Sequence, residues 1–336
     1  MHKLPKLDLN ITNDCNYRCT HCAFDSGEKK MRDIPLAKIK ELLIDTKSLG
    51  GERFDITGGE PTLRPDLEGI VLFGKSLGYK IELVTNGSLL SREKLVRLKG
   101  VGLDSVTISL DGPNYESYSE IRKVHRTTYE RVLKNITEAV GLGFAVKINT
   151  IAAKNNYERI PELTEFCIKA GIKEHGIYYF TPIGRGECGG LSAVEPVEWL
   201  RFVREKLLRY DDKIKMRIEI PLIEKGMLKK EFCCLAESER YHMQILPDGK
   251  VYPCAIAASY DKPIADLNKT RISGIWNNQF IWNSYWGSLN RFFNENNSAG
   301  YCVNFSGFKM QDYKYKYDLV CPLRKFSPGD LSCEGA

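Results

Sequence analysis

Short apolar runs alternate with longer amphipathic stretches over the first two thirds of the chain. The apolar runs predict six strands, at residues 7–12, 53–57, 80–85, 105–110, 145–151 and 176–180. Between them, apolar residues recur near helical spacing and predict helices at residues 36–49, 91–98, 129–142, 160–170 and 195–210. A repeated strand–helix order implies parallel strands joined by right-handed crossovers. The pattern therefore predicts an α/β core, built as an incomplete barrel or a doubly wound sheet.

The alternation stops after about residue 216, where a segment rich in cysteine and aromatic residues begins. We place the boundary at Lys215, which predicts a core domain over residues 1–215 and a small domain over residues 216–336. The aromatic residues between Trp276 and Tyr317 follow no period of 2 or 3.6. A small domain has too small a hydrophobic core to be stable without a metal or a similar crosslink. We therefore interpret this segment as a small core packed around metal, rather than as a substrate-stacking surface.

Composition narrows the class of protein. The chain has 336 residues, of which 43% are hydrophobic and 27% charged, as is ordinary for a soluble globular protein. Its net charge is +6, but the basic residues are scattered among 43 acidic ones, so neither nucleic-acid nor membrane binding is indicated. No apolar run approaches the roughly 20 residues of a membrane span, and the N-terminus has no apolar signal core. We expect a cytoplasmic protein.

Eleven cysteines then need an explanation, and metal ligation is a better one than disulfides in the reducing cytosol. Cys15, Cys19 and Cys22 follow the first predicted strand, at the end where active sites of βα folds collect. Three thiolates at this short spacing can hold one iron–sulfur cubane and leave one iron open to a ligand. The alternative is a zinc site, which prefers paired CxxC knuckles and four ligands.

Further polar motifs follow the later strands. Gly58 and Gly59, in a Gly-Gly-Glu-Pro sequence, let the backbone approach a ligand closely, and Glu60 offers an acceptor for an ammonium group. A Thr-Asn-Gly sequence at residues 85–87 follows the third strand, and Ser-Leu-Asp-Gly at residues 109–112 follows the fourth. Each motif alone could be a simple turn. Their position after successive strands predicts one shared site at the carboxyl ends of the sheet.

In type and order these motifs resemble those of the radical S-adenosylmethionine (SAM) superfamily, over about residues 7–190. The resemblance implies a partial (β/α)6, TIM-like barrel and a 4Fe–4S cluster on Cys15, Cys19 and Cys22, whose open iron binds SAM. It also implies reduction of the cluster by an electron donor such as flavodoxin or ferredoxin.

The same resemblance suggests which residues surround SAM. It implies that His21 packs near the adenine, that Gly58, Gly59 and Glu60 hold the methionyl amine, and that Ser109 and Asp111 face the ribose or carboxylate. The segment ending at Arg122 resembles the family's Ile-Arg-Gly sequence, whose arginine pairs with the SAM carboxylate. Lys123 replaces the glycine of that sequence here, which leaves the form of the following loop open.

The C-terminal cysteines point to a second cluster. Asp248-Gly249 lies between β-branched and aromatic runs and predicts a hairpin that brings Cys234 and Cys254 together. This segment resembles the opening of SPASM and twitch domains, which carry auxiliary iron–sulfur clusters. Because the compact CxxCxxxC group of a full SPASM domain is missing, we expect one auxiliary 4Fe–4S cluster. The expected ligands are Cys234, Cys254, Cys302 and Cys321. Cys233 could replace Cys234 as a ligand, and Cys333 could replace Cys302 or Cys321. The alternative is that Cys234 and Cys254 are two buried hairpin cysteines that bind no metal.

The implied activity is reductive cleavage of SAM to a 5′-deoxyadenosyl radical, which abstracts a substrate hydrogen. Relatives with this C-terminal region often mature peptides, so the leading substrate is a peptide or protein side chain that is oxidised, crosslinked or epimerised. Since only a few residues precede the first strand, we expect any leader recognition to come from a separate protein. One alternative is a small-molecule enzyme of tetrapyrrole, aminosugar or related metabolism. Another is a non-catalytic iron–sulfur electron carrier or scaffold, which would not need the motifs at residues 58–61 and 109–112.

Overall fold

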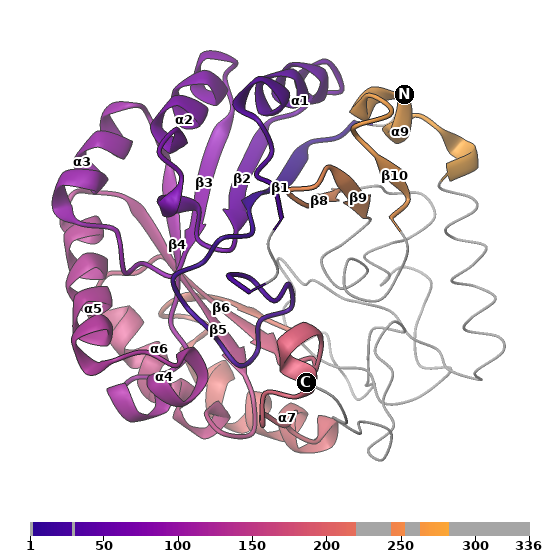
Figure 1. The fold of residues 1–336 in the computed structure, drawn as a ribbon. Coiled ribbons are helices and arrows are strands. Elements are labelled where there is room, and N and C mark those ends of the chain that lie inside the picture. Colours follow the sequence, from indigo (N-terminus) through magenta and orange to yellow (C-terminus); the bar gives the residue numbers. More distant parts are fainter. Residues whose placement is uncertain (1–2, 29–30, 220–242, 253–262, 282–336) are drawn as a thin grey trace, which may run out of the picture.

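A curved parallel sheet with helices along its outer side forms the core of the molecule (Figure 1). The computed structural model describes residues 3–28, 31–219, 243–252 and 263–281. The first six strands pair in chain order: β1 (Lys6–Thr12), β2 (Arg53–Gly58), β3 (Lys80–Thr85), β4 (Ser105–Ser109), β5 (Ala145–Ala152) and β6 (Glu174–Tyr179). The helices that follow them are α1 (Leu36–Ser48), α2 (Leu67–Ser76), α3 (Arg92–Gly100), α4 (Tyr115–Arg122), α5 (Arg126–Gly141), α6 (Ile160–Lys169) and α7 (Pro196–Phe202).

Four shorter strands extend this sheet at its two edges. β7 (Lys215–Ile218) pairs in parallel with β6. At the other edge, β8 (Gln244–Ile245) pairs in parallel with β1, and β9 (Lys250–Tyr252) and β10 (Ala265–Asp266) follow in antiparallel order. Among the described strands, no pairing joins β7 to β10, so the sheet is an open, partial barrel. The short helix α9 (Ile272–Trp276) packs near α1.

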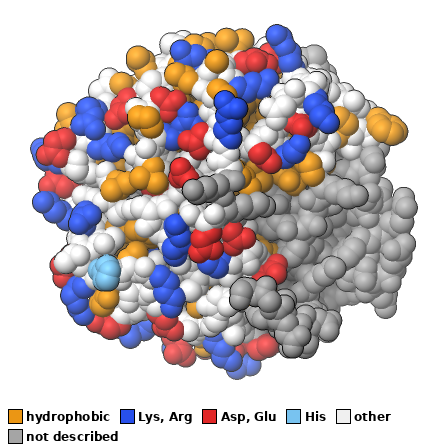
Figure 2. All heavy atoms as spheres, in the orientation of Figure 1, with side chains coloured by type: hydrophobic (Ala, Val, Ile, Leu, Met, Phe, Trp, Pro, Cys, Tyr) orange, Lys and Arg blue, Asp and Glu red, His pale blue; other side chains and the backbone are white. Residues whose placement is uncertain are grey.

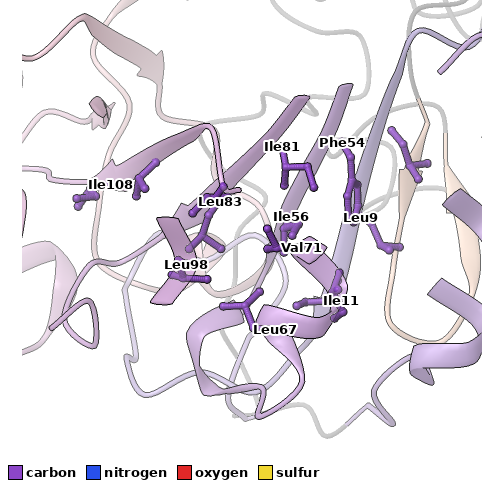
Figure 3. Packing of buried hydrophobic residues seen from close by; sticks show 14 of the residues in the cluster. Leu9, Ile11, Phe54, Ile56, Leu67, Val71, Ile81, Leu83, Leu98 and Ile108 are labelled. Atoms are coloured by element: carbon purple, nitrogen blue, oxygen red, sulfur yellow. The ribbon is translucent and has the colours of Figure 1, made fainter. Parts of the chain in front are cut away.

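Alternating side chains divide the sheet into an apolar outer face and a polar inner face. Leu9, Phe54 and Ile56 are fully buried toward the helices, where Leu67 and Val71 of α2 cover them (Figure 3). The residues between them point the other way because side chains alternate along a strand. The inner positions carry Asp8, Asp55 and Glu82, which lie beside one another in the register of β1, β2 and β3. The interior of the barrel is therefore polar.

The predicted strands and hairpin are confirmed, whereas three of the described helices, α2, α4 and the short α9, escaped prediction. All six strands form within a few residues of the expected bounds, and β8 and β9 form the hairpin across Gly249. The pattern missed α2, whose apolar run contains two glycines, and α4, whose start is capped by the Asn114 side chain accepting from the Ser117 N–H at 3.0 Å. The helix expected at residues 195–210 is α7 followed by a π turn (Val203–Leu207) and a 3-10 turn (Leu208–Tyr210). The expected boundary at Lys215 remains a prediction, and β7 begins at that residue.

The surface carries charge of both signs. On the face shown in Figure 2, lysine and arginine side chains are interspersed with aspartate and glutamate over the described part of the chain. Of the helices that the structure describes, none is both long enough and apolar enough to cross a bilayer.

Candidate cofactor site

The three clustered cysteines lie on a long loop that leaves the carboxyl end of β1. Cys19 is buried, and Cys15 and Cys22 are half-buried. Each sulfur accepts one hydrogen bond: from the Tyr17 N–H at Cys15 (3.4 Å), from Arg122 Nη1 at Cys19 (3.6 Å) and from the Ser26 N–H at Cys22 (3.4 Å). Donors at the sulfurs stabilise thiolates and raise the reduction potential of a cluster that the thiolates hold.

The arrangement fits a cluster better than a single zinc ion. No three Cys, His, Asp or Glu side chains within the described ranges are grouped so as to hold one metal ion. Ligands of a cubane bind separate irons and so stand farther apart than ligands of one ion. Burial raises the pKa of the Cys15 thiol to about 12, and it also raises the pKa of Cys19. Thiolates at this site therefore need the positive charge of bound iron.

A second loop, after β6, packs against the cysteine loop and hydrogen-bonds to it. Arg185 Nε donates to the Cys19 carbonyl at 2.9 Å, and Arg185 Nη2 donates to the Ser26 carbonyl at 3.1 Å. Gly184 has a φ of +54°, and a Cβ there would lie 2.5 Å from the Ala23 carbonyl oxygen, so the two loops touch through backbone. The sequence predicted no role for Arg185.

The two glycines of the 58–61 motif allow a similarly close approach. A Cβ on Gly59 would lie 2.3 Å from the Asp14 carbonyl oxygen, and one on Gly58 would lie 2.4 Å from the Thr12 carbonyl oxygen. The N–H of Gly59 donates to the Thr12 carbonyl, and the N–H of Glu60 donates to the Asp14 carbonyl, both at 2.8 Å. These glycines thus join the motif to the cysteine loop, beside the cofactor contact that the sequence predicts.

Glu60 is fully buried and ties the motif to the end of β3. Its Oε1 accepts from the Thr62 N–H at 3.1 Å and from the Thr62 and Thr85 hydroxyls. Its Oε2 accepts from the Asn86 N–H at 2.7 Å. A carboxylate oxygen has two lone pairs, so Oε2 retains one acceptor position. Most of the acceptor capacity of Glu60 is thus used by hydrogen bonds within the protein, and one lone pair on Oε2 is left for the predicted amine contact.

Three of the predicted SAM contacts pair with one another. Asp111 is buried, its Oδ2 accepts from Arg122 Nε and lies 3.0 Å from His21 Nε2, and its Oδ1 accepts from the Ile151 N–H at 2.8 Å. Burial alone would raise the pKa of Asp111, but the charges of Arg122 and His21 lower it. Arg122 also reaches Cys19, so an ionic bridge runs from the end of β4 to the cysteine loop.

The remaining predicted positions differ in how far the structure describes them. Lys123 ends α4 with a φ of +54°, so it adopts the left-handed conformation that the family's glycine would favour. Ser109 is half-buried at the end of β4, in register with Asn149 of β5. Six cysteines lie outside the described residues, so their ligand roles stay predictions: Cys233, Cys234, Cys254, Cys302, Cys321 and Cys333.

Comparisons with known proteins agree with this geometry. A model of the radical SAM superfamily matches residues 9–167, and a model of an iron–sulfur cluster-binding domain, SPASM, matches residues 233–303. A probable GTP 3′,8-cyclase of Saccharolobus islandicus is 32% identical over 276 residues, which cover 80% of each chain. The chain belongs to the radical SAM superfamily. This radical SAM protein also resembles the AdoMet-dependent heme synthase of Methanosarcina barkeri, with 29% identity over 194 residues that cover 57% of the chain and 55% of the relative.

Solved structures share the fold of this radical SAM protein. SuiB of Streptococcus suis bound to S-adenosylmethionine has a TM-score of 0.71 at 19% identity, and the match covers 84% of this chain and 68% of SuiB. The enzyme anSMEcpe with bound AdoMet has a TM-score of 0.66 at 16% identity, with 84% and 83% covered. The predicted partial barrel is confirmed. The family membership makes the chain an enzyme that uses SAM and a 4Fe–4S cluster, and the SPASM match implies auxiliary iron–sulfur clusters.

Proposed function

We propose that this enzyme abstracts a hydrogen atom from a side chain of a peptide or protein, using a cluster held by Cys15, Cys19 and Cys22. When bound, the reduced cluster and SAM supply the 5′-deoxyadenosyl radical that performs the abstraction. The observation that carries the proposal is the open sheet, because its polar inner face is not closed by strand pairing between β7 and β10 among the described residues. An extended peptide fits such an open edge, whereas a closed eight-stranded barrel is filled by its own side chains.

The protein's own residues would bind and orient the reacting groups. The N–H donors at the three sulfurs would orient the cysteines and hydrogen-bond their thiolates once iron is bound. The free acceptor position on Glu60 Oε2 suits the methionyl amine of SAM, next to the closely approaching backbone of Gly58 and Gly59. His21, Asp111 and Arg122 fix the cysteine loop against the end of β4, with Ser109 beside them. An external donor must supply the electron.

Two solved structures with this fold hold a bound peptide. One shows SuiB bound to its precursor peptide SuiA, and another shows anSMEcpe with a bound Cp18Cys peptide. Both are less than 25% identical to this chain, so the likeness supports the arrangement of the barrel and not the choice of substrate.

The test follows deuterium from substrate to product. The enzyme is reconstituted anaerobically with iron and sulfide and given dithionite, SAM and a peptide digest of uniformly deuterated protein. We expect 5′-deoxyadenosine that has gained deuterium, because the radical takes its hydrogen from the peptide. The triple variant with alanine at Cys15, Cys19 and Cys22 should lose about four irons per chain and form no 5′-deoxyadenosine. Cys167→Ala is the matched control, since Cys167 is a buried free cysteine in α6.

A small-molecule substrate is the second candidate. The sequence relatives favour it, because the 32% identical relative that covers 80% of the chain is a probable GTP 3′,8-cyclase. Uniformly deuterated GTP replaces the peptide digest in a parallel reaction. Deuterium that reaches 5′-deoxyadenosine from GTP, and not from the peptides, would contradict the peptide proposal and favour the nucleotide.

A further inference from the structure

A row of inner-face positions crosses four strands of the barrel. Ser109 of β4 is in register with Asn149 of β5, Asn149 with Gly176 of β6, and Gly176 with Arg217 of β7. Residues paired across neighbouring strands project to the same face of a sheet. The row lies on the inner face, because Ile148, the neighbour of Asn149 in β5, is fully buried in the apolar core under the helices.

Arg217 is the one arginine of this row, and it has no partner among the residues that the structure describes. Its Nε is buried and makes no hydrogen bond, and its guanidinium forms no ion pair with a described carboxylate. The two lysines one step down the sheet are paired, Lys147 with Glu82 and Lys215 with Glu174 at 2.7 Å. A buried donor without an acceptor destabilises the fold, and an acceptor that arrives with a ligand removes that cost.

Two more polar side chains surround the neighbouring glycine. A Cβ on Gly176 would lie 2.6 Å from Asn149 Oδ1 and 2.9 Å from Tyr178 Cε2, so the glycine makes room for both side chains. Burial raises the pKa of Tyr178 even though the charge of Arg217 lowers it, so the phenol keeps its proton. Arg217 thus lies beside Gly176 in the register of the sheet, and a phenol and a side-chain amide surround the same glycine.

We propose that Arg217, assisted by Asn149 and Tyr178, binds a carboxylate of the peptide substrate. A guanidinium presents parallel N–H groups that match the two oxygens of a carboxylate, and the charge on Arg217 is not neutralised by a described acid. The inference rests on the proposed function for the nature of the substrate. It makes Arg217 a residue that determines specificity.

The position of the row suits this role. Three strand spacings of about 4.8 Å put Arg217 about 14 Å from Ser109, the predicted neighbour of SAM. A carboxylate held at Arg217 would therefore place an adjoining residue of the peptide beside the abstracting radical.

The test measures binding to the reconstituted, SAM-loaded holoenzyme by calorimetric titration. The probes are a capped tripeptide with a central glutamate, the same tripeptide with glutamine, glutarate and inorganic phosphate. The variants are Arg217→Met, which removes the charge, Arg217→Lys, which keeps the charge without the paired N–H groups, and Arg131→Met, a control on the exposed side of α5. Iron content and thermal unfolding midpoint establish that each variant is folded and loaded.

We expect the wild type and Arg131→Met to bind the glutamate peptide about ten-fold more tightly than the glutamine peptide. Arg217→Met should lose that preference, and Arg217→Lys should keep only part of it. Equal or undetectable binding of the two peptides by the wild type, an unchanged preference in Arg217→Met, or a preference for phosphate would each overturn the carboxylate site. If glutarate binds as tightly as the glutamate peptide, and does so through Arg217, the site stands and the peptide function fails.

Discussion

Replacing Glu60 by glutamine changes a buried carboxylate into an amide of the same shape, and it tests whether this residue holds the 58–61 motif to β3. Each carboxylate oxygen accepts a hydrogen bond from a backbone N–H, Oε1 from Thr62 and Oε2 from Asn86. An amide has one oxygen and one NH₂ group, so in either orientation one backbone N–H faces another donor. The hydroxyls of Thr62 and Thr85 can rotate to accept, but the backbone cannot.

The expected loss of stability follows from these contacts. A buried backbone N–H without an acceptor costs about 1–3 kcal/mol, and the remaining bonds to a neutral amide are weaker than those to a carboxylate by about 1 kcal/mol. The neutral amide is easier to remove from water, which offsets part of the loss. We therefore expect Glu60→Gln to lower the free energy of unfolding by about 2 kcal/mol, a large share of the roughly 5–15 kcal/mol of a typical domain.

The assay is anaerobic urea unfolding followed by circular dichroism, with wild type and variant at equal iron content. Glu116→Gln is the control, because Glu116 is exposed and pairs with an exposed partner, Arg126. Its free energy of unfolding should equal that of the wild type. If Glu60→Gln has the same free energy of unfolding as the wild type, the carboxylate does not stabilise the fold as its four hydrogen bonds indicate.

Two further outcomes test other parts of the molecule. Burial lowers the pKa of His175 to about 3, from an unfolded value near 6.5. Below pH 6.5 the unfolded chain therefore binds a proton that the folded protein does not. The free energy of unfolding should fall as the pH drops below 6.5, by up to about 1.4 kcal/mol per pH unit. In urea titrations between pH 7.5 and 5, His175→Gln should show a flatter dependence, and an unchanged slope would exclude His175 as the source. Gly59→Ala should reduce the iron bound after reconstitution, because its Cβ would press on the Asp14 carbonyl. The control is Gly69→Ala on α2, whose Cβ would meet no atom within 4 Å and which should bind as much iron as the wild type. Equal iron in both variants would contradict the close approach.

The elements that the sequence predicted are those with a local signal. Six strands and the hairpin at Gly249 follow from period and turn residues, which act between neighbours in the chain. Because parallel strands put their carboxyl ends on one edge, the same pattern also placed the motifs around Cys15, Glu60 and Asp111 in one site. Helix α4 was missed, since its eight residues are mostly polar and its start depends on a cap from Asn114.

Which side chains pair was decided by the tertiary structure alone. Arg185 reaches the carbonyl of Cys19 across 166 positions, and Asp111 meets His21 across 90, distances over which periodicity carries no information. That Arg217 meets no partner among the described residues likewise depends on the register of β5, β6 and β7, which sets the residues beside it. Local sequence determines where an element forms and which face is apolar, because those depend on the chain's own period. Ion pairs and unsatisfied donors depend on packing between distant elements, so they become visible only when the sheet is assembled.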